Sequence, residues 1–302
     1  MDEYKKIIKS AKTRNRILNA LRFLPDKIML KIQYRIKLKR NLNLNNPIRY
    51  TEKIQWYKMN WRNPVMHQCV DKYKVREYVN NKGLGHILVN LLGHFKNVDE
   101  IKWNNLPDRF VIKTTHGGGG VNVVICNDKN KINFNELKEK LFFKNQPVKT
   151  NTGGREWAYY SLNPSIIVEE LLINTDCPEA GVTDYKIFCF NGKPEYIIVD
   201  VDRYIGHKRN FYDTNWNNLH IVSDCPAVVK DIPKPNNLDE MLEIASKLSK
   251  EFPHVRVDLY NLDGEIYFGE LTFYPWSGYV QFYPDSFDFD LGKKFILPEK
   301  MR

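Results

Sequence analysis

The segment RVDLYNLDGEIYFGELTF (residues 256–273) contains two runs of alternating apolar and polar side chains on either side of a short turn. This pattern predicts a hairpin of two paired strands. Side chains alternate between the two faces of a strand, so Arg256 and Asp258 share one face, and Glu270 and Thr272 share one face. Whether these are the same face of the sheet depends on the turn.

The register of the hairpin follows from the length of that turn. With a three-residue loop, Leu262–Gly264, Arg256 would lie opposite Glu270 and Asp258 opposite Phe268, so that all four polar residues converge. A two-residue turn would shift the register by one and place Asp258 and Glu270 on opposite faces. We predict the three-residue loop.

Convergence of the two acids would have a chemical consequence. Neighbouring carboxylates repel one another and raise each other's pKa unless a cation lies between them. Mg²⁺ is usually held by one or two carboxylates together with phosphate oxygens and water. Asp258 and Glu270 are therefore candidate magnesium ligands. The alternative is an ordinary cross-strand ion pair between Arg256 and Glu270 that binds nothing.

A glycine-rich loop lies upstream, in the segment KTTHGGGG (residues 113–120). We predict a strand that ends at Lys113, the loop, and a second strand from Val121 to Cys126. Backbone N–H groups of glycines can close around phosphate oxygens, and a lysine beside them adds positive charge. The segment lacks the Gly-Lys-Ser or Gly-Lys-Thr of a Walker loop. Four glycines can also form a flexible loop without a ligand.

The order of the expected elements predicts an α+β protein with a cleft between lobes. We divide the 302 residues into a basic amphipathic helical segment (1–47), an N-terminal lobe (48–106), a subdomain with the glycine hairpin (107–175) and a C-terminal subdomain with the acidic hairpin (176–302). In the last of these, the Asn191–Gly192 turn predicts another hairpin.

The chain is basic, with a formal net charge of +10, and the basic surplus is concentrated in the first forty residues. Such a segment suits nucleic acid, an anionic membrane surface or a uronic-acid glycan. No nucleic-acid module signature is present, so we expect no nucleic-acid partner. Apolar residues alternate with the cations between Ile17 and Arg40, as in membrane-surface helices. The alternative is a basic helical cap packed on the main body.

The sequence has no run of about 20 apolar residues that could span a membrane and no apolar signal core at its start. We therefore expect the protein in the cytoplasm or peripherally on the inner face of the membrane. Five scattered cysteines without a Cys-x-x-Cys pair indicate neither a disulfide framework nor a zinc site.

Taken together, these motifs resemble the ATP-grasp superfamily. The resemblance rests on Asp71-Lys72, the strand before the glycines, VEELL (168–172), Asp184-Tyr185-Lys186, Arg256-Val257-Asp258 and Gly269-Glu270-Leu271-Thr272. More narrowly, KIQW (53–56), DKYKVREYV (71–79), GGREW (153–157), HKRNFYD (207–213) and GELTF (269–273) resemble the TupA-like ATP-grasp family, which is associated with teichuronopeptide and other surface-polysaccharide biosynthesis.

The resemblance implies a role for each matching residue. Lys72 and Lys113 would hold the ATP phosphates under a lid formed by Gly117, Gly118, Gly119 and Gly120, beside His116. Glu169, Glu170, Leu171 and Leu172 would meet adenine and ribose, with Lys186 near the nucleotide. Asp258 and Glu270 would bind Mg²⁺. The superfamily usually has Asn at the position of Thr272, and a hydroxyl is a poorer ligand. Arg256, Lys186, Arg203 and Arg209 are the candidate catalytic cations, because positive charge can bind an acceptor carboxylate and stabilise a transferring phosphoryl group.

The function expected from this resemblance is ATP- and Mg²⁺-dependent ligation of a carboxylate to an amine through an acyl phosphate. The expected acceptor is a uronic-acid-containing polysaccharide or its lipid-linked or nucleotide-sugar precursor, and the expected amine is an amino acid or another amine. Two alternatives remain open. The same site could serve a glycan kinase, or the chain could be a non-catalytic glycan-binding subunit of a polysaccharide assembly complex.

Overall fold

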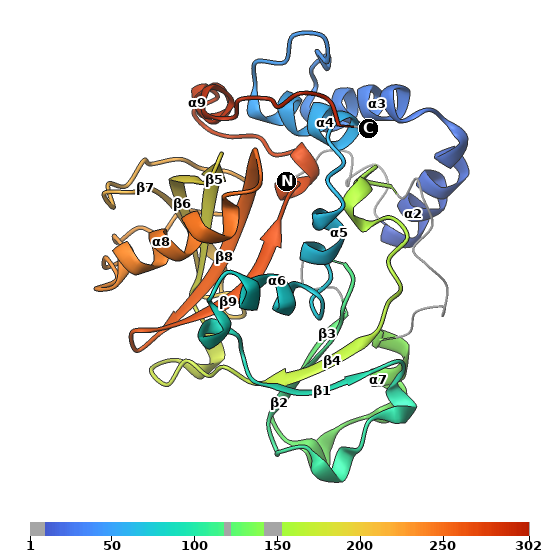
Figure 1. Cartoon of the computed structure of the whole chain (residues 1–302), viewed down its shortest axis with the longest axis vertical. Helices are drawn as coiled ribbons and strands as arrows, with labels where there is room; N and C mark the ends of the chain where they lie inside the picture. The colour runs from blue at the N-terminus through green and yellow to red at the C-terminus, as the bar shows by residue number, and fades with distance from the viewer. Residues whose placement is uncertain (1–9, 118–121, 142–152, 302) are drawn as a thin grey trace.

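The computed structural model describes residues 10–117, 122–141 and 153–301. The protein is α+β, as predicted, and is built on two separate antiparallel sheets, one of four strands and one of five (Figure 1). In Figure 1 the four-stranded sheet lies at the bottom and the five-stranded sheet at the left, with the helices of residues 11–38 at the upper right.

The four-stranded sheet has the order β1 (Leu91–Phe95), β4 (Ile166–Glu170), β2 (Phe110–Thr114) and β3 (Val123–Cys126). One face packs with α7 (Phe134–Leu141) into a small core that includes Phe110, Ile112 and Val168. Lys113 lies next to Ile112 in β2, so strand alternation directs its side chain to the opposite face.

The five-stranded sheet has the order β7 (Lys208–Asp213), β6 (Lys193–Val201), β5 (Asp184–Phe190), β8 (His254–Leu262) and β9 (Glu265–Thr272). Helix α8 (Leu238–Ser249) contributes buried side chains to the same core as the strands. The Cys189 thiol on β5 lies 3.8 Å from the Ala245 carbonyl on α8, so the face of the sheet that carries Cys189 is the one that packs against this helix. Lys186 and Arg256 belong to the other face.

Our prediction for the β8–β9 turn is wrong. The strands are joined by the two-residue turn Asp263–Gly264, in which both residues have positive φ, at 52° and 89°. Such a turn suits the twist of a hairpin. By itself it would place Asp258 and Glu270 on opposite faces, but the register shifts between Asp258 and Leu259. Asp258 therefore pairs with Glu270, and Arg256 with Thr272 rather than with Glu270.

This shift is a β-bulge at Gly269, and it requires a residue without a side chain. A Cβ atom at Gly269 would lie 2.9 Å from the Asp258 carbonyl oxygen. The extra residue in β9 reverses the alternation of side chains in the rest of the strand. The four polar residues thus share one face, by a route that we did not predict.

The polar face of the five-stranded sheet changes character along its strands. Toward one end, Phe188, Phe190 and His254 pack against Tyr50 and Phe295. Toward the other end the same strands carry Lys186, Asp184, Arg256 and Asp258. The aromatic half is covered by α4 (Tyr50–Asn60) and the residue after α9 (Ser286–Lys294). The charged half contains the candidate site.

The remaining helices are α2 (Ala11–Ala20), α3 (Asp26–Leu38), α5 (Val65–Val70) and α6 (Val75–Asn81). Short 3-10 turns occur at η1 (Leu21–Phe23), η2 (Gly85–Ile87), η3 (Val98–Glu100), η4 (Trp103–Asn105), η5 (Lys129–Lys131), η6 (Trp157–Tyr159), η7 (Pro178–Ala180) and η8 (Pro275–Gly278). Within the described ranges, none of the helices combines the length and the apolar character needed to cross a bilayer.

Candidate active site

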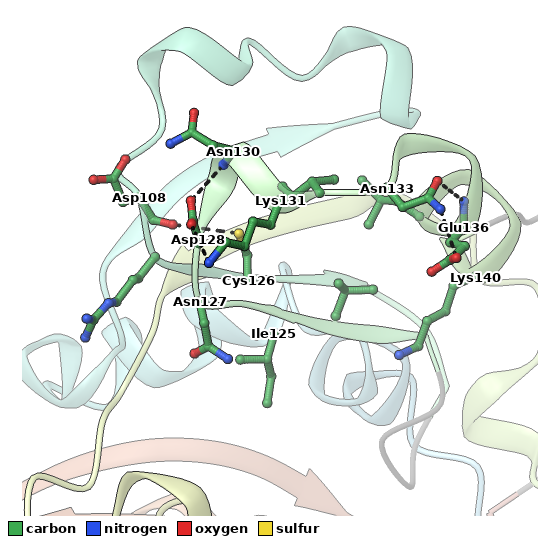
Figure 2. A pocket seen from close by; sticks show the side chains of 14 residues that line it. Asp108, Ile125, Cys126, Asn127, Asp128, Asn130, Lys131, Asn133, Glu136 and Lys140 are labelled. Carbon is green, nitrogen blue, oxygen red and sulfur yellow. Dashed lines mark hydrogen bonds and ion pairs between the residues drawn. The ribbon is translucent and has the colours of Figure 1, made fainter.

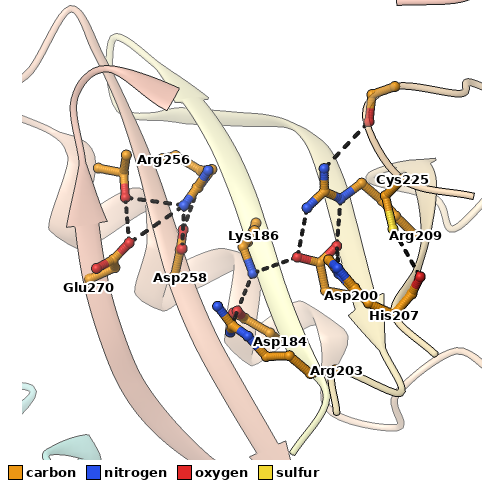
Figure 3. A network of polar contacts seen from close by, with 12 residues as sticks. Asp184, Lys186, Asp200, Arg203, His207, Arg209, Cys225, Arg256, Asp258 and Glu270 are labelled. Atoms are coloured by element: carbon orange, nitrogen blue, oxygen red, sulfur yellow. Dashed lines mark hydrogen bonds and ion pairs between the residues drawn. The ribbon is translucent and has the colours of Figure 1, made fainter. Parts of the chain in front are cut away.

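The centre of the site is a cluster of charges on β8 and β9 (Figure 3). Arg256 donates from Nε to Asp258 Oδ1 at 2.7 Å and from Nη2 to Oδ2 at 2.6 Å. The same Nη2 lies 3.2 Å from the Thr272 hydroxyl and 3.6 Å from Glu270 Oε1. Thr272 in turn donates to Glu270 at 3.0 Å. Arg256 therefore lies between the two carboxylates.

The surroundings shift the pKa values of the two acids in opposite directions. Burial raises the pKa of Asp258 to about 7, against the opposing influence of Arg256 and Lys186. Burial also tends to raise the pKa of Glu270, but Arg256 and Lys72 outweigh it and lower that pKa. The side chain of Glu270 is 38% exposed, whereas that of Asp258 is 5% exposed. Glu270 is thus the more accessible anion of the pair.

The charged surface continues across β5 and β6. Lys186 forms ion pairs with Asp184 and, at 3.0 Å, with Asp200. Arg203 lies 3.0 Å from Asp184. A second oxygen of Asp184, Oδ1, is buried and has no hydrogen-bond partner among the described residues. An unpaired buried oxygen is costly, so a donor or a cation at this position would be favourable.

Arg209 anchors the far end of this network. It forms two hydrogen bonds with Asp200, at 2.5 and 3.0 Å, and a third with Asp224 at 2.5 Å. Its guanidinium also lies 5.4 Å from the ring centre of Trp276, whose indole N–H donates to Asp224. Burial tends to raise the pKa of Asp200, yet Arg209 and Lys186 hold it well below its ordinary value. Asp200 is therefore ionised and serves to position both cations.

The four-stranded sheet supplies a second set of charges. Glu169 on β4 forms ion pairs with Lys113 on β2, at 2.5 Å, and with Arg76 on α6, at 3.0 Å. In the β2–β4 register Val111 pairs with Glu169 and Lys113 with Ile167, so Lys113 and Glu169 are diagonal neighbours on one face. Arg76 also donates to the Val89 carbonyl at 2.9 Å.

Lys72 connects the two sets. Its backbone N–H donates to the Thr115 carbonyl at 2.8 Å, and its ammonium group donates to the Gly117 carbonyl at 2.5 Å. Burial lowers the pKa of Lys72, partly offset by the negative charge of Glu270. The Lys72 ammonium therefore lies within electrostatic reach of both the glycine loop and the acidic hairpin.

A small pocket brings the two sheets together. It is lined by Lys72, Val75, Arg76, Leu88, Lys113, Glu169, Phe268 and Gly269. Two predicted phosphate-binding lysines thus face the strand that carries Glu270. Gly117 has φ 84°, a conformation that favours glycine, and Gly118, Gly119 and Gly120 lie outside the described residues.

The other described residues that we predicted to contact the nucleotide around β4 and the glycine loop do not line this pocket. Glu170 ends β4 and is exposed, while Leu171 and Leu172 follow the strand and are partly buried. None of the three lines the pocket. His116 lies beside the glycine loop, and burial, followed by the charge of Lys72, lowers its pKa.

Sequence reasoning did not assign a role to Arg76, Asp184 or Asp200. Asp184 is two residues from Lys186, and this spacing places both on one face of a strand. Arg76 is four residues beyond Lys72, but a loop separates Lys72 from α6. Asp200 could be suspected only as an acid that directly follows the apolar run 197–199 in β6.

A larger hollow lies elsewhere, between β3, the residues that follow it and α7 (Figure 2). It measures about 790 Å³ and is lined by residues such as Arg109, Asp128, Lys131 and Lys140. None of the predicted site residues borders it. We therefore place the candidate site at the smaller pocket, where the charges converge.

The residues present fit Mg²⁺ only when phosphate accompanies it. Within the described residues, no group of three or more His, Cys, Asp or Glu side chains is arranged to hold a metal by itself. Asp258 and Glu270 pair directly across neighbouring strands and offer hard oxygen ligands, although each Asp258 oxygen already accepts one hydrogen bond from Arg256. Two carboxylates completed by phosphate oxygens and water are typical of magnesium bound with a nucleotide.

Comparison with solved structures gives distant similarities. A D-alanine–D-alanine ligase from Bacillus anthracis is 21% identical, with 68% of this chain and 57% of that chain covered and a TM-score of 0.41. The Helicobacter pylori enzyme is 15% identical, with 84% and 68% covered and a TM-score of 0.46. An L-amino acid ligase from Bacillus licheniformis is 16% identical, with 71% and 43% covered and a TM-score of 0.41. The chain thus spans little more than half of the first of these structures.

No curated protein matches the chain. The decisive comparison is with protein families, where the family described as TupA-like ATPgrasp matches residues 52–296. This range includes both sheets, the glycine loop and every predicted site residue. The chain therefore belongs to the TupA-like ATP-grasp family.

Proposed function

We propose that this protein uses ATP and Mg²⁺ to join a carboxylate to an amine through an acyl phosphate. The observation that supports this most directly is the pocket in which Lys72 and Lys113 face the β9 strand that carries Glu270. Cations on one side and carboxylates on the other are suited to a triphosphate and its metal.

The proposed acceptor is a uronic-acid-containing surface polysaccharide, or its lipid-linked or nucleotide-sugar precursor. The family's association with surface-polysaccharide biosynthesis suggests this class. The proposed amine is an amino acid or another amine. Arg256, Arg203 and Arg209 are candidate contacts for an acidic acceptor, because all three lie on the charged face.

The proposed reaction has two steps. A carboxylate oxygen attacks the γ-phosphorus of ATP, the bond to the ADP oxygen breaks, and an acyl phosphate forms. The amine nitrogen then attacks the acyl carbon, and the carbon–oxygen bond to phosphate breaks. Inorganic phosphate leaves with the electron pair of that bond, and the nitrogen loses a proton. Lys72 and Lys113 would orient the phosphates, and Arg256 would stabilise charge on the transferred group. Asp258 and Glu270 would hold Mg²⁺, which when bound would neutralise the negative charge of the phosphates.

The test is a turnover screen with acidic sugars and amines. We expect ADP and inorganic phosphate to form only when an acidic sugar is present. Replacing the amine with hydroxylamine should give an acyl hydroxamate, because hydroxylamine traps acyl phosphates. The mass of the product distinguishes the proposal from a glycan kinase. Phosphate retained on a sugar hydroxyl would reject ligation, and failure to bind Mg²⁺-ATP would reject enzymatic activity.

A further inference from the structure

Helix α3 (Asp26–Leu38) carries two exposed stripes along its outer face. Ile28, Ile32 and Ile36 are 47%, 39% and 48% exposed, and their spacing of four residues aligns them. Lys27, Lys31 and Arg35 are also exposed and precede each isoleucine by one position. A row of cations therefore runs beside a row of large apolar side chains.

The opposite face of α3 is firmly attached to the protein. Met29, Leu30, Tyr34 and Leu38 are buried. Gln33 on the same face donates to the Gly153 carbonyl at 2.7 Å and accepts from the Tyr279 hydroxyl at 2.6 Å. The isoleucine stripe is thus additional to the face that already anchors the helix. A helix needs only one apolar face for packing, so the second requires another explanation.

The chain segment that contains the stripe is strongly basic, although its Arg40 and Arg49 pair with Asp285 and Asp288. Residues 10–51 contain eleven lysines and arginines and a single acid, Asp26. Asp26 is engaged by Arg155 at 2.8 Å, so its charge is already compensated. Arg16, Arg22, Ile17 and Phe23 are exposed just before α3, and Phe23 is 76% exposed. The same mixture of cationic and apolar side chains therefore extends beyond the helix.

We propose that α3 and the turn before it lie on the surface of an anionic lipid bilayer. The isoleucines and Phe23 would enter the boundary between headgroups and acyl chains, and the adjacent cations would contact acidic headgroups. A polyanion in water, such as a nucleic acid or a free acidic glycan, would use the cations but leave the isoleucines exposed. The paired stripes therefore favour a membrane. This inference does not depend on the proposed reaction.

The test is flotation of the full chain with vesicles of phosphatidylcholine alone or mixed with phosphatidylglycerol. We expect binding to the mixed vesicles that weakens as salt rises. The double variant Ile28→Ser/Ile32→Ser and the double variant Lys27→Gln/Lys31→Gln should each weaken binding roughly tenfold. Thermal melting of each variant checks that the fold is retained, since these side chains point outward.

Matched controls replace residues elsewhere on the surface that are at least as exposed as the isoleucines. Val229→Ser/Ile296→Ser and Lys230→Gln/Lys234→Gln should bind the mixed vesicles as the unaltered chain does. Absence of binding to mixed vesicles would overturn the proposal. Full binding by the isoleucine variant would also overturn it, and would indicate a purely electrostatic surface for a soluble polyanion. An equal loss of vesicle binding in the control variants would show that the outer face of α3 has no special role in binding.

Discussion

At the scale of single residues, the site depends on charges that compensate one another. Arg256 is held by Asp258 through two hydrogen bonds and lies close to Glu270. Both side chains of the Arg256–Asp258 pair are less than 10% exposed. Removing one partner of such a pair leaves the other charge uncompensated and is costly. Glu270 is more exposed, so it can be changed with less effect on the fold.

Glu270→Gln should therefore separate function from stability. We expect turnover to fall by at least about a hundredfold, because loss of a metal-binding charge removes several kcal/mol of transition-state stabilisation. The melting temperature should change little. The exposed Glu265 on the same strand provides the control, and Glu265→Gln should remain active. Unchanged turnover in Glu270→Gln would refute the magnesium assignment.

A different prediction concerns His254 and the stability of the fold in acid. It is fully buried, with its ring near the Tyr50 hydroxyl and the Cys189 carbonyl, and burial lowers its pKa to about 3. In the unfolded chain the His254 imidazole binds a proton as pH falls through about 6.5, whereas in the folded chain it stays neutral down to about pH 3. Stability should therefore fall as pH decreases from about 6.5 toward 3, by up to about 1.4 kcal/mol per pH unit from this residue.

The measurement is urea unfolding between pH 6.5 and 4.5 for the unaltered chain and His254→Gln. The substitution should lower stability at pH 6.5, where it removes the buried contacts of His254, and the slope of stability against pH should become shallower. The exposed His86 is the control, and His86→Gln should keep the original slope. An identical slope in His254→Gln would show that His254 does not carry this dependence.

At the scale of elements, the β8–β9 hairpin combines a tight turn with a bulge. The Asp263–Gly264 turn alone would separate Asp258 from Glu270, and the bulge at Gly269 brings them together. A one-residue change of register moves a whole strand from one face to the other. The close approach of Gly269 to the Asp258 carbonyl is thus a requirement of the site as well as of the sheet.

Gly269→Ala should disturb both the candidate site and the pairing of β8 with β9. Its Cβ would lie 2.9 Å from the Asp258 oxygen, which forces the bulge to shift. We expect a loss of about 1–3 kcal/mol in unfolding free energy, typical of overpacking, together with a marked fall in turnover. Gly264→Asn in the same hairpin is the control, because Asn tolerates positive φ. Normal activity in Gly269→Ala would mean that the register does not depend on this glycine.

At the scale of the whole molecule, the two sheets contribute opposite parts of the candidate site. Lys113 belongs to the four-stranded sheet and Glu270 to the five-stranded sheet, and the pocket joins their strands. A ligand held from both sides stabilises the folded state by mass action. Nucleotide binding should therefore be visible as thermal stabilisation even without turnover.

We expect Mg²⁺-ATP at one hundred times its dissociation constant to stabilise the protein by about 2.7 kcal/mol and to raise its melting temperature by a few degrees. Lys113→Gln and Glu270→Gln should each reduce this rise, although they lie on different sheets. The exposed Lys102 is the control, and Lys102→Gln should show the full rise. A full rise in either cleft variant would place the nucleotide against one sheet only.

Much of this protein could be predicted from local sequence. Alternation of side chains indicated the hairpin strands, and turn formers marked their ends. The motifs around Lys72, Lys113, Asp258 and Glu270 indicated an ATP-grasp protein, and the family match agrees. Such inferences succeed because strand periodicity and turn preference depend on neighbours within a few residues.

Tertiary structure alone decided how these residues meet. The register of β8 and β9 depends on the close approach of Gly269 to the Asp258 carbonyl on the neighbouring strand, which no local pattern reveals. Glu169 binds Arg76 and Lys113, residues 93 and 56 positions away in the chain. Helix α3 has one buried and one exposed apolar stripe, and its sequence shows both as apolar without distinction. Charge pairing and burial depend on distances in space, and only the folded chain determines those distances.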